Sequence, residues 1–237
     1  MPELICDLPM RWADLDELSH VNNVVYLDYA AEARAVHVAA GELAGDEPTQ
    51  VGVEFLRPLL LSRTPVRVRS RLDDGVLVQE LGPATADVAF ARVVSRYAPV
   101  VVEGPGADPG PRIGDPYGVR VRRSDLGADG RVELARVFEY TQEARISTFS
   151  HLREESEPHE RIVVARVDVT LGEPFAWRTE EYRADTHLVR LGASSCTVRT
   201  FFEDGRHGRA DAVLVGFDLR TQRSRPLTAH ERSVLGG

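Results

Sequence analysis

The sequence contains no lysine, since all 29 of its basic residues are arginine. The chain therefore cannot form a lysine Schiff base, and it has no lysine for a phosphate-binding P-loop. It has only two cysteines, Cys6 and Cys196, which lie far apart and lack the spacing of metal ligands. A disulfide between them stays open, but two isolated cysteines fit a reducing compartment more simply.

Long apolar runs and excess positive charge are also absent. No segment approaches the roughly 18 consecutive apolar residues of a membrane helix, and residues 1–12 lack the basic and apolar regions of a signal peptide. With 29 basic and 37 acidic residues, the net charge of −8 disfavours binding to nucleic acids or anionic membranes. We therefore expect a cytoplasmic protein with no nucleic-acid or membrane partner. Its 43% hydrophobic and 28% charged residues indicate a folded chain and exclude disorder.

The chain does contain an internal repeat. When Arg11–Arg34 is aligned without gaps to Arg122–Arg145, at an offset of 111 residues, eight of the 24 positions are identical. The identical pairs include Arg11 with Arg122, Asp14 with Asp125, Leu15 with Leu126, Val21 with Val132 and Tyr29 with Tyr140. Farther along, Leu81-Gly82 and Leu191-Gly192 have nearly the same offset. The chain is therefore predicted to hold two copies of one unit.

A stretch rich in proline and glycine lies between the two copies. Residues 99–116 cannot hold a regular helix or a central strand, so they predict a linker or a long loop. This gives an N-terminal unit at 1–98 that carries the polar motif described below. A C-terminal unit at 117–237 carries a degenerate copy of that motif.

Each unit has the same predicted order of elements: a short strand, a turn, one long helix and four further strands. In the first unit we expect a strand at 8–13, a helix at 22–40 that Gly41 ends, and strands at 51–56, 65–72, 76–81 and 86–97. In the second unit we expect a strand at 118–124, a helix at 132–151, and strands at 162–171, 175–184, 188–202 and 210–219. The first helix is apolar at most positions, which predicts burial on most sides. The predicted fold is α+β, with an antiparallel sheet curled around one helix in each unit.

Polar residues gather in the turn before the first predicted helix, which contains Asp16, His20, Asn22 and Asn23. The free N–H groups at a helix start form the positive end of the helix dipole, and they can bind an anion or a carbonyl oxygen. A carboxylate beside such donors can activate water and stabilise an oxyanion, which is what acyl transfer requires. Asparagine before a helix is also a common cap, and a single histidine is often structural, so this alternative stays open.

The repeat offers a test of these roles. Arg11 and Asp14 recur in the second copy, which favours a structural role for both. The other four polar residues do not recur, because their positions hold Gly127, Arg131, Glu133 and Leu134. Residues present in only one copy are functional candidates, although drift of the second copy would give the same pattern.

The string Trp12-x-Asp14-Leu15-Asp16-x-x-x-His20-Val21-Asn22-Asn23-x-x-Tyr26, followed by Glu32-Ala33-Arg34, resembles the hotdog-fold thioesterases. The closest groups are the 4-hydroxybenzoyl-CoA-type acyl-CoA thioesterases and the acyl-ACP thioesterases, and the likeness continues at Arg57-Pro58-Leu59. The resemblance implies two tandem hotdog units, each a sheet wrapped around one long helix, which pair as an intramolecular pseudo-dimer. It also implies hydrolysis of a fatty or aromatic acyl-CoA, without a metal or a cofactor beyond the substrate's own coenzyme A.

The same resemblance assigns roles to residues. Asp16 is implied to act as nucleophile or general base, His20 to assist or orient it, and backbone N–H groups around Asn22–Val24 to polarise the thioester carbonyl. The catalytic candidates are Asp16, His20, Asn22 and Asn23, and the substrate-binding candidates are Val24, Tyr26, Glu54, Ser194 and Ser195. Because Gly127 replaces the acid in the second copy, one working site per chain is expected.

Several alternatives remain. Acyl-ACP is a possible substrate, but the asparagine expected between Asp16 and His20 is Leu18 here, and the expected glutamate of the next strand is replaced near Pro58. The acidity of ACP and the net charge of −8 also argue mildly against it. A hydratase is less favoured, since its Asp-x-Asn-x-x-His pattern is missing. A non-catalytic acyl-thioester-binding hotdog protein and a homodimer of these chains both stay open.

Overall fold

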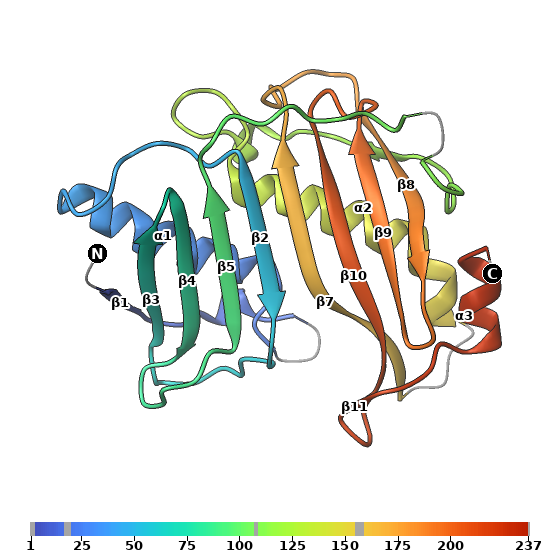
Figure 1. Ribbon diagram of the computed structural model, residues 1–237, viewed down its shortest axis with the longest axis horizontal. Helices are drawn as coiled ribbons and strands as arrows, with labels where there is room; N and C mark the ends of the chain where they lie inside the picture. Colours follow the sequence, from blue (N-terminus) through green and yellow to red (C-terminus); the bar gives the residue numbers. More distant parts are fainter. Residues whose placement is uncertain (1–2, 17–19, 107–108, 155–158, 237) are drawn as a thin grey trace. The chain divides into compact units, whose positions relative to one another are not determined.

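The computed structural model describes residues 3–16, 20–106, 109–154 and 159–236. The chain divides into two compact units, Met1–Val100 and Val101–Gly237. Each unit consists mainly of antiparallel strands and has one long helix (Figure 1). Within the described residues, no helix is long and apolar enough to cross a membrane.

The first unit contains five antiparallel strands in the order β1-β3-β4-β5-β2. They are β1 (Leu4–Leu8), β2 (Gln50–Phe55), β3 (Val66–Asp73), β4 (Val76–Pro83) and β5 (Ala91–Arg96). The alternating Val-Arg pattern of β3 places Val66 and Val68 in the core, both fully buried, while Arg67 and Arg69 are partly exposed. This is the half-buried antiparallel strand that the sequence predicts.

Helix α1 (Val25–Ala39) lies against β1, β3, β4 and β5. It begins three residues later and ends one residue earlier than predicted, and Gly41, whose φ of 74° suits glycine, follows its C-terminal end as expected. The buried Gln79 of β4 donates through Nε2 to the backbone oxygen of Ala30, at 2.9 Å, and thereby joins sheet and helix. The predicted burial on most sides is wrong for the later turns, where Val36 is 44% exposed. Alanine-rich helical positions favour a helix without needing burial, which explains the difference.

The second unit has the strand order β6-β8-β9-β10-β7, with the short β11 paired to β10. These strands are β6 (Tyr117–Val119), β7 (Glu160–Leu171), β8 (Tyr182–Leu191), β9 (Ser195–Phe202), β10 (Gly208–Asp218) and β11 (Arg223–Ser224). Its helices are α2 (Leu134–Glu154) and α3 (Ala229–Val234). Apart from β11, the order of these strands corresponds, position by position, to the order in the first unit.

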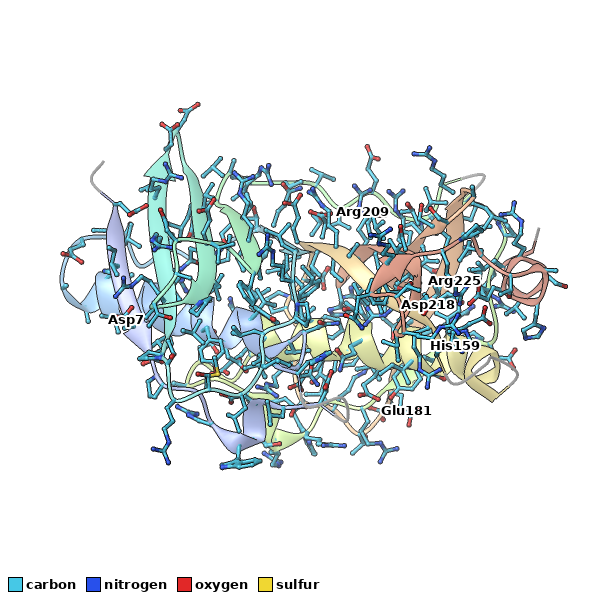
Figure 2. All side chains as sticks on the ribbon, turned by 90° about the horizontal axis from the view of Figure 1, so that it is seen from below. Asp7, His159, Glu181, Arg209, Asp218 and Arg225 are labelled. Carbon is cyan, nitrogen blue, oxygen red and sulfur yellow. The ribbon has the colours of Figure 1, made fainter. Side chains whose placement is uncertain are left out.

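An aromatic cluster and an ion pair hold the second unit together. The ring of Phe175 packs edge-on against Tyr140, Tyr182 and Phe202, with ring centroids 4.9 to 5.8 Å apart. Arg225 binds the buried carboxylate of Glu231 on α3 through two hydrogen bonds of 2.6 and 2.8 Å. Figure 2 shows Arg225 beside Asp218 and His159 at the same part of this unit.

Several predicted strand limits are wrong. The first strand ends at Leu8, because residues 12–14 form a 3-10 helix that positions Asp14. Residues 175–181 lie outside any strand, since Phe175 anchors a loop in the core with its large ring. The single strand predicted at 188–202 is two strands, β8 and β9, joined by a turn at 192–194. Likewise, only 91–96 of the stretch 86–97 is a strand.

The prediction that Leu81-Gly82 and Leu191-Gly192 belong to the repeat is also wrong. Leu81 and Gly82 lie inside β4, whereas Leu191 is the last residue of β8 and Gly192 begins the following turn. In the corresponding strand orders, β4 matches β9 rather than β8. The two dipeptides therefore occupy different structural positions.

Candidate active site

The turn before α1 is built on the buried carboxylate of Asp14. Its Oδ2 atom accepts hydrogen bonds from the backbone N–H of Arg11, at 2.7 Å, and from the Tyr29 hydroxyl, at 2.5 Å. Burial, and then the hydrogen bond to Asp14, raise the pKa of Tyr29 above its ordinary value, so the phenol keeps its proton and donates it. These contacts fix the 3-10 helix Trp12–Asp14 and give Asp14 a structural role.

Two hydrogen bonds join Asp16 and His20. The backbone N–H of Asp16 donates to the His20 carbonyl, at 2.8 Å, and the His20 N–H donates to the Asp16 carboxylate oxygen Oδ1, at 3.0 Å. Both residues are partly exposed. The departure noted at Leu18 lies outside the described residues. The His20 N–H therefore holds the carboxylate of Asp16, a residue that is only partly buried, in a defined orientation.

Asn22 lies in the turn before α1, two residues before the N-cap residue Val24. Its side-chain Oδ1 accepts from the Val24 N–H, at 3.1 Å, and its backbone oxygen accepts from the Val25 N–H, at 2.9 Å. Its own N–H donates to the Asp14 carbonyl. Among the described residues, the structure gives the N–H of Asn23 no acceptor. The N–H groups of Asn22 and Val24 already donate hydrogen bonds within the protein. Of the predicted oxyanion donors at residues 22–24, the N–H of Asn23 is therefore the one that stays available to a substrate.

Tyr26 links this turn to the segment that follows β2. Its hydroxyl oxygen accepts from the Leu59 N–H, at 3.1 Å, and the Leu59 carbonyl accepts from the Val21 N–H, at 2.8 Å. A further bridge joins His20 to Leu60. Burial raises the pKa of Tyr26 to about 12. The segment around Pro58 is therefore fastened to the turn at two points.

The remaining predicted site residues are dispersed. Val24 is buried at the start of α1, and Glu54 lies on β2 opposite Arg92 of β5. Ser194 and Ser195 belong to the second unit, in and after the turn from β8 to β9, where the Ser195 carbonyl accepts from the Gly192 N–H at 2.8 Å. A role for these residues in substrate binding stays a prediction.

The second unit repeats the hydrogen bonds of this turn without its acid. The Oδ2 atom of Asp125 accepts from the Arg122 N–H, at 2.8 Å, and from the Tyr140 hydroxyl, at 2.7 Å. Gly127 donates through its N–H to the Arg131 carbonyl, at 2.8 Å, as Asp16 does to His20. The tyrosine of this network was not expected, although its identity at the offset of 111 was the signal that could have revealed it. No cluster of metal ligands occurs in the part of the chain that the structure describes.

Comparisons with known proteins bear on the family and the fold. Residues 3–61 match the family model of the acyl-ACP thioesterase C-terminal domain. No curated protein matches the chain.

Among solved structures, one titled as an oleoyl thioesterase from Lactobacillus plantarum has a TM-score of 0.66 at 14% identity, over 92% of this chain and 97% of that one. The 12:0-ACP thioesterase from Umbellularia californica has a TM-score of 0.64 at 10% identity, over 90% and 94%. An acyl-ACP thioesterase from Bacteroides thetaiotaomicron VPI-5482 has a TM-score of 0.59 at 10% identity, over 90% and 97%. The resemblance to hotdog-fold thioesterases that the motif indicates is therefore confirmed, and the chain has the fold of these proteins.

Proposed function

We propose that the protein is a thioesterase that hydrolyses acyl thioesters at a site built on Asp16. The observation that carries this proposal is the pairing of two groups at the start of α1. A carboxylate held by the His20 N–H, at 3.0 Å, lies in the same turn as the N–H of Asn23, which has no acceptor among the described residues. A base or nucleophile and an oxyanion donor are the two groups that acyl transfer needs.

In the proposed reaction, the Asn23 N–H binds the thioester carbonyl oxygen with the support of the helix dipole. Asp16 acts in one of two ways. As a general base, it takes a proton from water, whose oxygen attacks the carbonyl carbon; the C–S bond then breaks and the thiolate leaves with a proton. As a nucleophile, it forms an acyl-aspartyl anhydride with loss of the thiolate, and water then hydrolyses that anhydride. His20 orients the carboxylate through its backbone N–H.

We further propose that the two units are copies of one hotdog unit, with limits near 1–98, 99–116 and 117–237. The equal strand order and the hydrogen bonds repeated at an offset of 111 residues support this. Two copies in one chain would form a pseudo-dimer. Because Gly127 replaces the acid in the second copy, this pseudo-dimer would have a single working site. Pairing of whole chains stays a separate prediction.

The carrier of the acyl group is proposed to be coenzyme A, with ACP as the second candidate. One local feature favours ACP over the expectation from net charge. Arg11, Arg57 and Arg63 are exposed and have no ion-pair partner among the described residues, although the whole chain is acidic. Trp12, the sequence neighbour of Arg11, is 82% exposed. An acidic carrier protein would complement such a surface, and the family model points the same way.

The first test is thiol release from a panel of short, long and aromatic acyl-CoAs, for the wild type and Asp16→Asn. General base catalysis is worth about 10²–10⁴ in rate, so the variant should lose at least about 100-fold. Asp129→Asn is the matched control, because it changes the same group in the corresponding turn of the second unit. Saturable binding without thiol release would instead support the non-catalytic acyl-thioester binder.

The carrier is tested by comparing acyl-CoA with acyl-ACP that bears the same acyl group. If ACP is the partner, Trp12→Ala should raise KM for acyl-ACP and leave KM for acyl-CoA unchanged. Equal effects on both substrates would assign Trp12 to the turn itself and would favour coenzyme A.

A further inference from the structure

The turn before α2 repeats the backbone of the proposed active site. The Gly127 N–H donates to the Arg131 carbonyl, at 2.8 Å, as the residues 111 positions earlier do in the first unit. The Glu133 N–H likewise donates to the Asp125 carbonyl, at 3.2 Å. Among the described residues, the N–H of Leu134 at the start of α2 has no acceptor. The two turns therefore differ in their side chains rather than in their backbone.

The side chain of Glu133 lies in the space beside Gly127. A Cβ atom at Gly127 would lie 3.3 Å from the Glu133 Cγ and 3.4 Å from its carboxylate oxygen Oε1. Both distances are shorter than an ordinary van der Waals contact. The first unit has Asp16 at this position, and it has the neutral Asn22 in place of the glutamate. A side chain at position 127 and the observed side chain of Glu133 thus compete for the same space.

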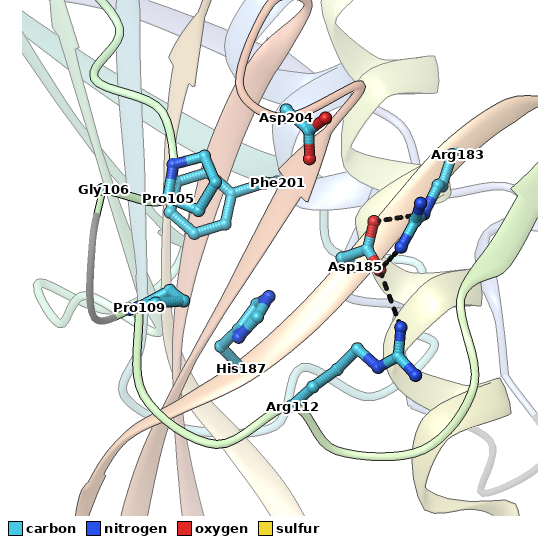
Figure 3. Close-up of a pocket in the computed structure, with 9 residues that line it drawn as sticks. All are labelled: Pro105, Gly106, Pro109, Arg112, Arg183, Asp185, His187, Phe201 and Asp204. Atoms are coloured by element: carbon cyan, nitrogen blue, oxygen red, sulfur yellow. Dashed lines mark hydrogen bonds and ion pairs between the residues drawn. The ribbon is translucent and has the colours of Figure 1, made fainter.

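No cation neutralises the carboxylate of Glu133 in the described part of the chain. Other acidic side chains of this unit do have arginine partners. Figure 3 shows Arg183 and Arg112 beside Asp185, with contacts of 2.6 and 3.6 Å. Glu133 is exposed, and among the described residues its side chain has no hydrogen bond or ion pair. The start of α2 therefore carries an uncompensated negative charge.

This charge opposes the chemistry proposed for the first turn. There, the positive end of the helix dipole and a free N–H bind a carbonyl oxygen that becomes an oxyanion. A carboxylate at the same helix start weakens that positive field and repels negative charge on a substrate. The first turn instead has Asn22, whose neutral side chain accepts from the Val24 N–H at 3.1 Å. The missing acid at Gly127 and the charge of Glu133 thus act in the same direction.

We propose that Glu133 closes the second turn to acyl thioesters, because it fills the space beside Gly127 and places a negative charge at the start of α2. This inference rests on the proposed function of the first turn, whose backbone the second turn shares. It assigns the inactivity of the second copy to two residues. Restoring an acid at position 127 alone therefore leaves the turn inactive.

The effect of the charge is tested by moving it to the first turn. Asn22→Glu and Asn22→Gln both introduce the same longer side chain, and they differ only in charge. The kcat/KM for thiol release should be at least about 10-fold lower in Asn22→Glu than in Asn22→Gln, because a single oxyanion contact is worth about 10²–10³ in rate. Equal values in the two folded variants would overturn the proposal.

The second turn is tested in a background whose first turn carries Asp16→Asn. Two variants there receive Gly127→Asp and Asp129→Leu, the residues that the first turn has at these positions, and one of them also receives Glu133→Asn. Gly127 has no positive φ, so its backbone accepts aspartate. The variant with Glu133→Asn should release thiol at least about 10-fold faster than the variant that keeps Glu133. Equal rates, or no release by either, would overturn the proposal.

Wild type and Asp16→Asn are assayed beside these variants, with circular dichroism to confirm that each is folded. A wild-type rate in Asp16→Asn would refute the proposed function itself. An inactive Asp16→Asn, together with equal rates within each pair of variants, would refute the role of Glu133 alone.

Discussion

Replacing Tyr29 or Tyr140 by phenylalanine separates the structural network from the catalytic turn. Each tyrosine hydroxyl donates to a buried carboxylate, that of Asp14 at 2.5 Å or that of Asp125 at 2.7 Å. A hydrogen bond to a charged group contributes about 1.5–3 kcal/mol, and the phenylalanine ring keeps the packing. Each variant should therefore lower the stability of its own unit by about that amount. For a domain of this size, a loss of 1.5 kcal/mol lowers the melting temperature by about 6 °C.

The two variants should differ in activity. The Asp14 carbonyl accepts the Asn22 N–H, so Asp14 holds the strand pair that brings Asp16 opposite His20. A displacement of about 1 Å at a reacting group can cost up to 100-fold in rate. We expect Tyr29→Phe to reduce kcat by about 10-fold or more, and Tyr140→Phe to leave it within about two-fold of the wild type.

Both variants are assayed for thiol release at a temperature below both unfolding transitions, with circular dichroism to confirm that each is folded. Equal losses of kcat in the two variants would refute the assignment of catalysis to the first unit. Unchanged stability in both would refute the structural role of the shared network.

Three further predictions follow from single contacts. Tyr26→Phe leaves the buried Leu59 N–H without its acceptor, so urea unfolding should show a loss of about 1–3 kcal/mol. Burial alone would raise the pKa of Glu231, but the hydrogen bonds from Arg225 and Thr228 hold it below its ordinary value. The ionised carboxylate therefore stabilises the fold above about pH 4.3, and this contribution is lost as the pH falls through the lower folded pKa; Glu231→Gln should flatten that acid dependence. Burial raises the pKa of Cys196 to about 11, so at pH 8 a thiol reagent should label it only on unfolding.

The sequence predicted the arrangement of elements better than their limits. Period-two alternation identified β3 correctly, because one face of that strand is fully buried. It failed at Phe175, which looks like a strand residue but lies in a loop, and at the turn after Leu191. A buried aromatic residue gives the same local signal in either setting, and only tertiary contacts, such as those of Phe175 with Tyr182, distinguish them.

The details of the candidate site were beyond the sequence for a different reason. Asn22 and Asn23 are adjacent and identical, yet the first accepts hydrogen bonds from the Val24 and Val25 N–H groups and the second leaves its N–H without an acceptor in the described residues. Which asparagine accepts these bonds depends on where α1 begins, and a sequence pattern places the start of a helix only to within a few residues. The pairing of Leu59 with Val21 joins segments 38 positions apart, and no local pattern could have predicted it.

The repeat is nevertheless the most informative feature, because it divides the turn into residues with different purposes. The positions that are identical at the offset of 111, Asp14 and Tyr29 among them, form the same buried hydrogen bonds in both units. The positions that differ include Asp16 and Gly127, whose backbone hydrogen bonds are nevertheless the same. The N–H of the residue at position 16 or 127 thus makes the same hydrogen bond with or without a carboxylate there. The Asp16 carboxylate also accepts the His20 N–H, at 3.0 Å, a contact that Asp129 makes with the Arg131 N–H in the second unit. Asp16→Gly should therefore abolish thiol release and, through the lost hydrogen bond, lower the free energy of unfolding by about 0.5–1.5 kcal/mol. A much larger loss of stability would assign the Asp16 carboxylate to the fold instead of the chemistry.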